Sequence, residues 1–207
     1  MLTAFTAGLL LITISELGDK TFFIGMILAM RYPRRWVLAG VVMALATMTI
    51  LSVAIGQILS FLPQNYIHYA EIILFLIFGT KLLFEAWKMG DQANLDVLEE
   101  AEEAIESGER QLKHAPKGWG IFLESFVLTF VAEWGDRTQI ATIALAASQN
   151  VIGVTTGAIL GHTICALIAV LGGKLIAGRI SERTVTALGG GLFYLFAAVA
   201  IARKLSI

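Results

Sequence analysis

Six long runs of apolar residues follow one another along the chain, and short polar connections separate them. The runs cover residues 2–30, 36–60, 66–88, 119–148, 151–177 and 184–203. Each run can cross the hydrocarbon layer of a bilayer, which is roughly 30 Å thick, as a helix of about 20 residues. The pattern therefore predicts an all-α, polytopic membrane protein with six transmembrane helices.

The first and fourth runs are longer than a straight crossing requires, so we expect these two helices to be tilted or broken. Gly18 and Gly135 lie near the middle of these two runs. Glycine has no Cβ and adopts backbone angles that interrupt a helix. The breaks are therefore expected at these two glycines.

Residues 89–118, between the third and fourth runs, form the one strongly polar segment of the sequence. Acidic residues dominate it, and Leu98, Ile105 and Leu112 recur at every seventh position. This spacing predicts a charged helix with one thin apolar stripe. We interpret the segment as an acidic, solvated cytoplasmic linker, and a regulatory or cation-gathering element is the alternative interpretation.

The composition supports a membrane protein. Apolar residues make up 57% of the 207 residues and charged residues 15%, and the mean hydropathy is +0.78. A soluble domain carries about 25% charged residues, so we expect the lipid bilayer to surround most of this chain. The single cysteine, Cys165, excludes an intramolecular disulfide and a cysteine-based metal cage. The apolar N-terminus lacks a basic start and a convincing cleavage site, so we interpret it as the first span and not as a signal peptide.

The basic residues predict the orientation of the spans, because cytoplasmic connections carry an excess of Lys and Arg. The connections after the first, third and fifth runs hold Arg31, Arg34, Arg35, Lys88, Arg110, Lys113, Lys117, Arg179 and Arg183. The opposite side offers only Arg203 and Lys204. We therefore expect a multi-pass protein of the cell membrane with both termini external. In a Gram-negative bacterium this is the inner membrane, with the termini in the periplasm.

The two halves of the chain, residues 1–88 and 119–207, are related by an internal repeat. A shift of 117 residues aligns the segment ELGDKT, which begins at Glu16, with EWGDRT, which begins at Glu133. The same shift pairs Gly40 with Gly157 and Gly56 with Gly173. Each half contains three spans, an odd number, so the second half enters the membrane from the other side. Inverted repeats of this kind are typical of secondary transporters, which bind substrate near the midplane where the repeats meet.

The two motifs place charged groups in the middle of apolar runs. A single charge at the centre of a membrane helix costs roughly 2.5 to 3.5 kcal/mol on insertion scales, and function is the usual reason for keeping one there. Glu16 and Asp19 are three positions apart, as are Glu133 and Asp136, so each pair is expected on one helix face. Pseudo-two-fold symmetry would then gather four carboxylates around one point. Hard divalent cations prefer such oxygen-rich sites.

The charge balance of the motifs favours exchange. Lys20 and Arg137 oppose four carboxylates, and the two remaining negative charges match one divalent cation or two protons. Neutral side-chain groups and a nearby imidazole complete the predicted site. The accessory residues are Ser15, Lys20, Thr21, Arg137, Thr138, Gln139 and His162. The motifs contain no Cys or His, which favours manganese, calcium or magnesium over zinc or copper.

Other interpretations of these residues stay open. Glu16 with Lys20, and Glu133 with Arg137, have the i to i+4 spacing of intrahelical ion pairs, which could simply hold the bundle together. Such pairs would leave the two aspartates without partners, so we rank them second. His162 is more often a packing residue than a ligand, and a proton relay is the alternative. A passive divalent-cation channel would use the same acids. A membrane enzyme acting on lipid phosphates would need a basic cluster that these motifs lack.

The motifs ELGDKT and EWGDRTQ, followed by GAILGH and AVLGGK, resemble the ExGD(K/R)(T/S) family of six-span membrane proteins. This family includes the Golgi manganese transporter and its bacterial manganese-exporting relatives. The resemblance covers both repeats and leaves out the central acidic segment. It implies exchange of Mn²⁺ or Ca²⁺ for protons, with the acids of both motifs as ligands.

From the residues and the resemblance together, we predict a secondary transporter that exports Mn²⁺ from the cytoplasm in exchange for protons, with Ca²⁺ as the second candidate ion. The cation is the transported substrate, and we expect no cofactor, no enzymatic activity and no nucleic-acid partner. Assembly into a homo-oligomer is an open alternative to a single copy.

Overall fold

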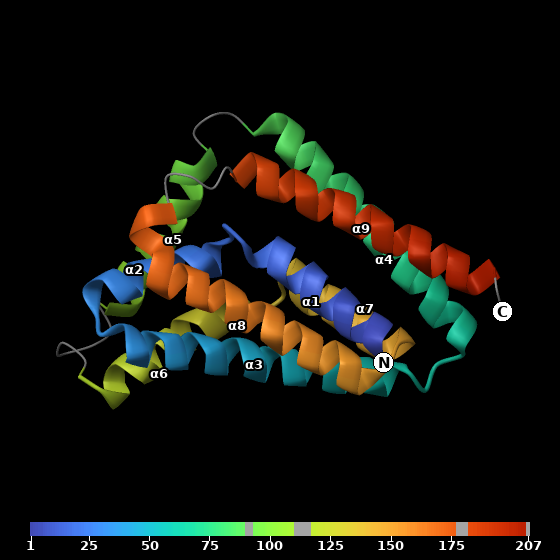
Figure 1. Ribbon diagram of the computed structural model, residues 1–207, viewed down its shortest axis with the longest axis horizontal. Helices are drawn as coiled ribbons and strands as arrows, with labels where there is room; N and C mark the ends of the chain where they lie inside the picture. Colours follow the sequence, from blue (N-terminus) through green and yellow to red (C-terminus); the bar gives the residue numbers. More distant parts are fainter. Residues whose placement is uncertain (90–92, 110–116, 177–181, 206–207) are drawn as a thin grey trace.

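The computed structural model describes residues 1–89, 93–109, 117–176 and 182–205, and within these ranges the regular secondary structure is helical (Figure 1). The first half contains α1 (Leu2–Glu16), α2 (Lys20–Arg31), α3 (Arg34–Leu59) and α4 (Gln64–Lys88). The linker contains α5 (Ala93–Glu109). The second half contains α6 (Trp119–Ala132), α7 (Arg137–Ser148), α8 (Val151–Ile176) and α9 (Glu182–Leu205).

The helices repeat with the same register as the sequence. Shifting α2 and α3 by 117 residues gives the bounds of α7 and α8, and shifted α1 and α4 agree with α6 and α9 to within one residue. The first and fourth predicted spans are each divided into two helices, as expected. The prediction of an all-helical membrane protein built from two repeated halves is therefore confirmed.

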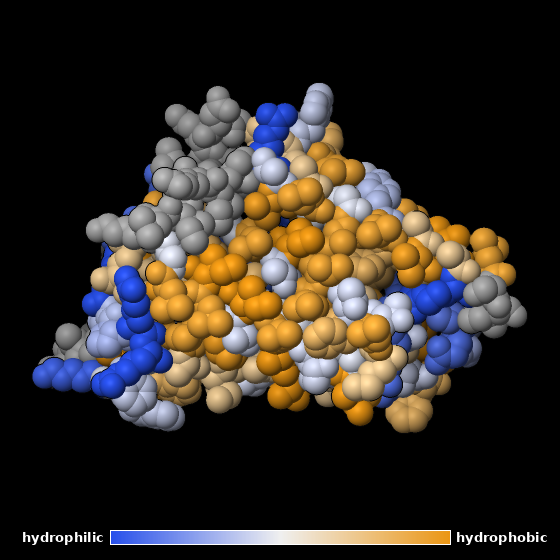
Figure 2. Space-filling model, viewed as in Figure 1, coloured by the Kyte–Doolittle hydropathy of each residue, from blue (hydrophilic) through white to orange (hydrophobic). Residues whose placement is uncertain are grey.

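Among the described residues, the helices α3, α4, α8 and α9 are long and apolar enough to cross a membrane. The pair α1 and α2, bent by 66° at its break, qualifies as a fifth span. The pair α6 and α7 is the repeat equivalent of that bent pair, but α6 is only a shorter apolar helix, so the sixth span stays a prediction. Both termini lie at the same end of the molecule (Figure 1), and apolar residues dominate the visible face between two hydrophilic ends (Figure 2).

Glycines allow the closest helix contacts between the two halves. α8 packs against α1, and α3 packs against α6. A Cβ atom at Gly157 would overlap the carbonyl oxygen of Phe5, and one at Gly40 would overlap that of Phe122. These two contacts are equivalent under the 117-residue shift. Small residues let membrane helices approach closely, so Gly40 and Gly157 act as packing residues between the two halves.

The arrangement departs from two-fold symmetry at α4, α5 and α9. α4 and α9 lie side by side (Figure 1), and α4 also packs against α7 while α9 packs against α1. α5 covers α2, the helix equivalent to α7. Ala101 and Ile105 of α5 are fully buried in the apolar cluster that contains Phe23 and Met26 of α2. The expectation of a solvated linker helix is therefore wrong for this face of α5, because the apolar stripe has a partner.

Candidate cation site

Both motifs lie at helix breaks, and a glycine with a left-handed backbone makes each break. Glu16 is the last residue of α1, Gly18 has φ of 81° and Asp19 precedes α2. In the second half, Glu133 follows α6 and Gly135 has φ of 85°. Glycine adopts this conformation without a steric penalty. The breaks are as predicted, but the expectation that each acid pair shares a helix face is wrong, because the two acids of a motif belong to different helices.

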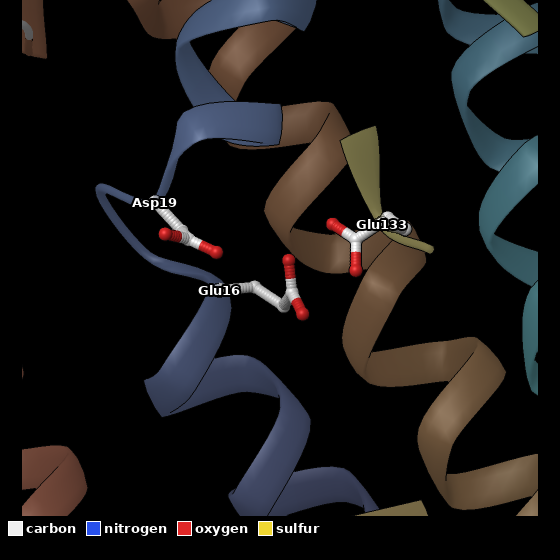
Figure 3. A group of neighbouring side chains, drawn as sticks. All are labelled: Glu16, Asp19 and Glu133. Atoms are coloured by element: carbon white, nitrogen blue, oxygen red, sulfur yellow. The ribbon is translucent and has the colours of Figure 1, made fainter. Parts of the chain in front are cut away.

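Three of the four predicted acids converge. Glu16, Asp19 and Glu133 each offer a carboxylate oxygen, and the three oxygens lie within 4.8 Å of one another. Figure 3 shows the Glu16 carboxylate pointing toward Glu133 across the interface of the two halves, with Asp19 above it. Glu16 and Glu133 are each 2% exposed. Ca²⁺ binds oxygen at about 2.3 to 2.6 Å, so one ion between the three groups could contact all of them.

Asp136 lies outside this group of three. Its Oδ2 atom accepts hydrogen bonds from the backbone N–H of Thr138, at 3.3 Å, and from the Thr138 hydroxyl, at 3.1 Å. Its Oδ1 atom lies 3.8 Å from Nε of Arg137. Asp136 thus caps the N-terminus of α7. Its charge is near the site, but a threonine and an arginine already hold its carboxylate.

The neutral accessory residues differ in what they contact. The Thr21 hydroxyl donates a hydrogen bond to Oε2 of Glu16 at 3.2 Å, which holds that carboxylate in place. Gln139 accepts a hydrogen bond of 2.7 Å from the backbone N–H of Gly135 and donates one to Sδ of Met48, so it stabilises the second break. The Ser15 hydroxyl is buried and has no hydrogen-bond partner among the described residues.

His162 lies on α8 and is buried. Its Nδ1 atom has no hydrogen-bond partner within the described part of the chain. Its burial is consistent with a packing residue, and the choice between packing and ligation stays a prediction. A role in a proton relay stays a prediction.

The two basic residues of the motifs bind acids outside their own helix turns. Arg137 lies 3.7 Å from Asp19 in the other half and 3.4 Å from Glu85 of α4. Lys20 lies 3.7 Å from Glu100 of α5. Among the described residues, neither base pairs with the glutamate four positions earlier. The alternative of purely intrahelical pairs fails because the helix breaks remove the i to i+4 geometry.

Sequence reasoning missed the contribution of Glu85. The sequence predicts a local pair of Glu85 with Lys81, and this pair is present with an N–O distance of 3.7 Å. The additional contact with Arg137 depends on how closely α4 approaches α7. An acid near the end of an apolar span was the available signal.

A cavity of about 90 Å³ lies between α4, α9 and the first helix break, and Asp19 is one of the residues that line it. It is lined by Ser15, Leu17, Gly18, Asp19, Leu82, Glu85, Met89, Arg137, Thr138, Val185, Thr186, Gly189 and Phe193. Glu16 and Glu133 are absent from this lining and are almost fully buried. An ion entering through the cavity would therefore meet Asp19 and Arg137 before it reached the two glutamates.

Comparison with known families identifies this architecture. The family model described as the divalent cation/proton antiporter GDT1 matches residues 4–90 and 121–206. The chain belongs to the GDT1 family. The two matched segments correspond to the two repeated halves and leave out most of the acidic linker. The activity is therefore the exchange of divalent cations for protons across a membrane, and both are transported substrates.

Several GDT1 relatives are similar over nearly the whole chain. A GDT1-like protein of Synechocystis sp. is 74% identical over 199 residues, which cover 96% of this chain and 97% of the relative. GDT1-like protein 3 of Oryza sativa subsp. indica is 46% identical over 92% of this chain and 70% of its own length. Protein PAM71-homolog, chloroplastic, of Arabidopsis thaliana is 43% identical over 95% of this chain and 58% of its own length. No solved structure matches the chain.

Proposed function

We propose that this GDT1 protein exports Mn²⁺ from the cytoplasm in exchange for protons, with Ca²⁺ as the second candidate ion. One observation carries the proposal: carboxylates from both halves converge at buried helix breaks. Glu16, Asp19 and Glu133 bind the ion, and Asp136 contributes its charge from the edge of the site. All of these groups are oxygen donors, which fits a hard divalent cation.

Exchange follows from the burial of the acids. Removing a carboxylate from water is costly unless a cation or a proton offsets its charge. The site therefore holds either the divalent ion or protons, and one replaces the other. A group that titrates within such a cluster does so together with its neighbours, so protons enter the cluster as a set.

The basic residues support the proposed direction. Among the described residues, the end of the molecule where α2 and α4 end carries Arg31, Arg34, Arg35, Lys88, Lys117 and Arg183, while Arg110, Lys113 and Arg179 lie outside the described ranges. We place this end in the cytoplasm and the termini outside the cell or in the periplasm. The cavity that Asp19 lines is also lined by Glu85 and Met89, which lie near the same end of α4. We propose that Mn²⁺ from the cytoplasm enters through this cavity.

The release of the ion on the other side requires a second arrangement of the helices. α4 and α9 pack against each other, α4 also packs against α7, and α9 also packs against α1. Two-fold symmetry would place α9 against α2 as α4 lies against α7, but among the described helices this packing is not found. In folds of inverted repeats, one set of helices rocks against another around a fixed site. We propose that the α4 and α9 pair moves relative to the helices that hold the carboxylates.

Inside-out membrane vesicles with an acidic interior test the proposal, because Mn²⁺ uptake into them corresponds to export from the cytoplasm. We expect Mn²⁺ to accumulate against its gradient while the pH gradient stands and to leave when a protonophore collapses it. Glu16→Gln and Glu133→Gln should abolish uptake. Glu99→Gln, which removes an exposed acid of α5, is the matched control. Undiminished uptake by the two site variants would refute the assigned site. Uptake of Ca²⁺ without uptake of Mn²⁺ would show that Ca²⁺, and not Mn²⁺, is the transported ion.

A further inference from the structure

Glu85 of α4 lies outside both motifs, yet it contacts the motif arginine. Its Oε2 atom accepts a hydrogen bond from Arg137 at 3.4 Å, and its Oε1 atom lies 3.7 Å from Nζ of Lys81. Glu85, Arg137 and Asp19 line the same cavity. The three side chains therefore face one another without an intervening element.

Arg137 presents a different nitrogen to each of three acids. Its NH1 atom faces Glu85, its NH2 atom lies 3.7 Å from Asp19 and its Nε atom lies 3.8 Å from Asp136. The fork of the guanidinium group allows all three contacts at once. Small rotations of the side chain can strengthen one contact at the expense of the others, without a movement of the backbone.

The binding of a divalent cation creates a conflict for Arg137. The arginine neutralises Asp19 while the site is empty of metal, and a cation that uses Asp19 must weaken this ion pair. The guanidinium group stays charged at all accessible pH values, so it cannot leave the site by losing a proton. A charge in a low-dielectric cavity is costly unless another acid pairs with it.

We propose that Glu85 is a positioning residue that holds Arg137 against α4 while the cation binds. This inference rests on the proposed role of Glu16, Asp19 and Glu133 as ligands. Glu85 does not touch the ion. It gives Arg137 a partner outside the group of three acids, so that Asp19 is free to bind the cation. Because α4 belongs to the pair of helices proposed to move, the contact also links the position of α4 to the charge of the site.

The first half has a weaker version of the same arrangement. Lys20 is the repeat equivalent of Arg137, and its partner is Glu100 of α5 at 3.7 Å. The repeat equivalent of Glu85 is Ala202, so α9 offers no acid at this position. The Glu100 side chain is 65% exposed, and water and salt screen such a pair. We therefore expect Glu85 to influence cation binding more than Glu100.

A double-mutant cycle on the purified full-length protein tests the role of Glu85, with Mn²⁺ alone as the probe. The loss of the electron paramagnetic resonance signal of free Mn²⁺ measures binding directly, without transport. We expect Glu85→Gln to weaken Mn²⁺ binding about tenfold, and Glu85→Asp to restore part of the loss. In an Arg137→Gln background, Glu85→Gln should have no further effect, because the group that it positions is gone. Glu99→Gln controls for the loss of one negative charge.

Three results would overturn the inference. If the Glu85→Gln variant binds Mn²⁺ as tightly as the Glu99→Gln variant does, Glu85 has no role in cation binding. A loss of the same size with and without Arg137 would show that Glu85 acts directly on the ion. If Glu85→Gln does not fold, Lys81→Gln gives an independent answer. This substitution removes the Lys81 contact, so Glu85 pairs with Arg137 alone. Mn²⁺ binding should then become a few fold tighter, and weaker binding would contradict the inference.

The proposed function fails in a distinguishable way. In that case, Glu16→Gln and Glu133→Gln would bind Mn²⁺ as tightly as the unmodified protein, whatever Glu85→Gln does. If these two variants lose binding while Glu85→Gln does not, only the inference about Glu85 is wrong.

Discussion

The two acids of the second motif should differ in their importance for cation binding. Glu133→Gln and Asp136→Asn each remove one negative charge and change the size of the side chain very little. Glu133 belongs to the group of three converging carboxylates, whereas Asp136 lies outside it and is held by Thr138 and Arg137. We therefore expect a much larger loss of Mn²⁺ affinity in Glu133→Gln.

The geometry gives the size of the difference. The three oxygens lie within 4.8 Å of one another, so an ion equidistant from them is at most about 2.8 Å from each oxygen. Even with the dielectric constant of water, a divalent ion and a carboxylate at about 2.8 Å attract each other by about 3 kcal/mol. Losing this attraction weakens binding about 150-fold. For a carboxylate outside the group, at a distance taken as about 5 Å, the attraction is about 1.7 kcal/mol, or about 15-fold in affinity.

The assay is a titration of the purified variants with Mn²⁺, followed by the paramagnetic resonance signal of the unbound ion. Glu99→Gln serves again as the control for an exposed acid, and the melting temperature of each variant shows that it is folded. If Asp136→Asn loses as much affinity as Glu133→Gln, or more, then the group of three carboxylates is not the binding set and the reasoning from their convergence is refuted.

Three further predictions concern the helices that support the site. Gly157→Leu should destabilise the protein by about 3 kcal/mol, because even a Cβ atom there overlaps the backbone of α1. Gly191→Leu, whose Cβ atom meets open space, is the control and should be less destabilising; thermal unfolding in detergent compares the two variants. Gly135→Ala should cost about 1 to 2 kcal/mol through its positive φ alone, and Gly135→Asn should cost less; equal melting temperatures would contradict this. Ile105→Glu should detach α5 from α2, so limited proteolysis within α5 should become faster; unchanged cleavage would show that the buried face of α5 does not hold it.

The sequence was sufficient to predict the helices and the repeat, because hydropathy and the order of residues reveal both without knowledge of tertiary contacts. Hydropathy marks the spans, since the bilayer imposes one length on every crossing. The break points followed from Gly18 and Gly135, because a left-handed backbone near the middle of a long run suits glycine. The identity of the four candidate acids followed from the cost of charge at membrane depth.

The arrangement of the acids could not be predicted from their spacing. An uninterrupted helix would place Glu16 and Asp19 on one face, but the break puts them on two helices that meet at an angle. The second break uses Asp136 as the cap of α7, and this local demand draws its carboxylate away from the other three. The partner of Arg137 depends on the tertiary contact between α4 and α7, which no local pattern encodes.

The repeat itself hides the most informative feature of the site. A shift of 117 residues makes Lys20 and Arg137 equivalent, so symmetry alone predicts the same surroundings for both. In the structure, one faces the exposed acid of α5 and the other faces an acid of α4 inside the cavity. A strictly symmetric site would present the same charge environment to both sides of the membrane. Because the partners differ, the free energy of cation binding at the site depends on which base pairs with which acid. A single pair of helices, α4 and α9, can change that assignment on the Arg137 side by moving Glu85.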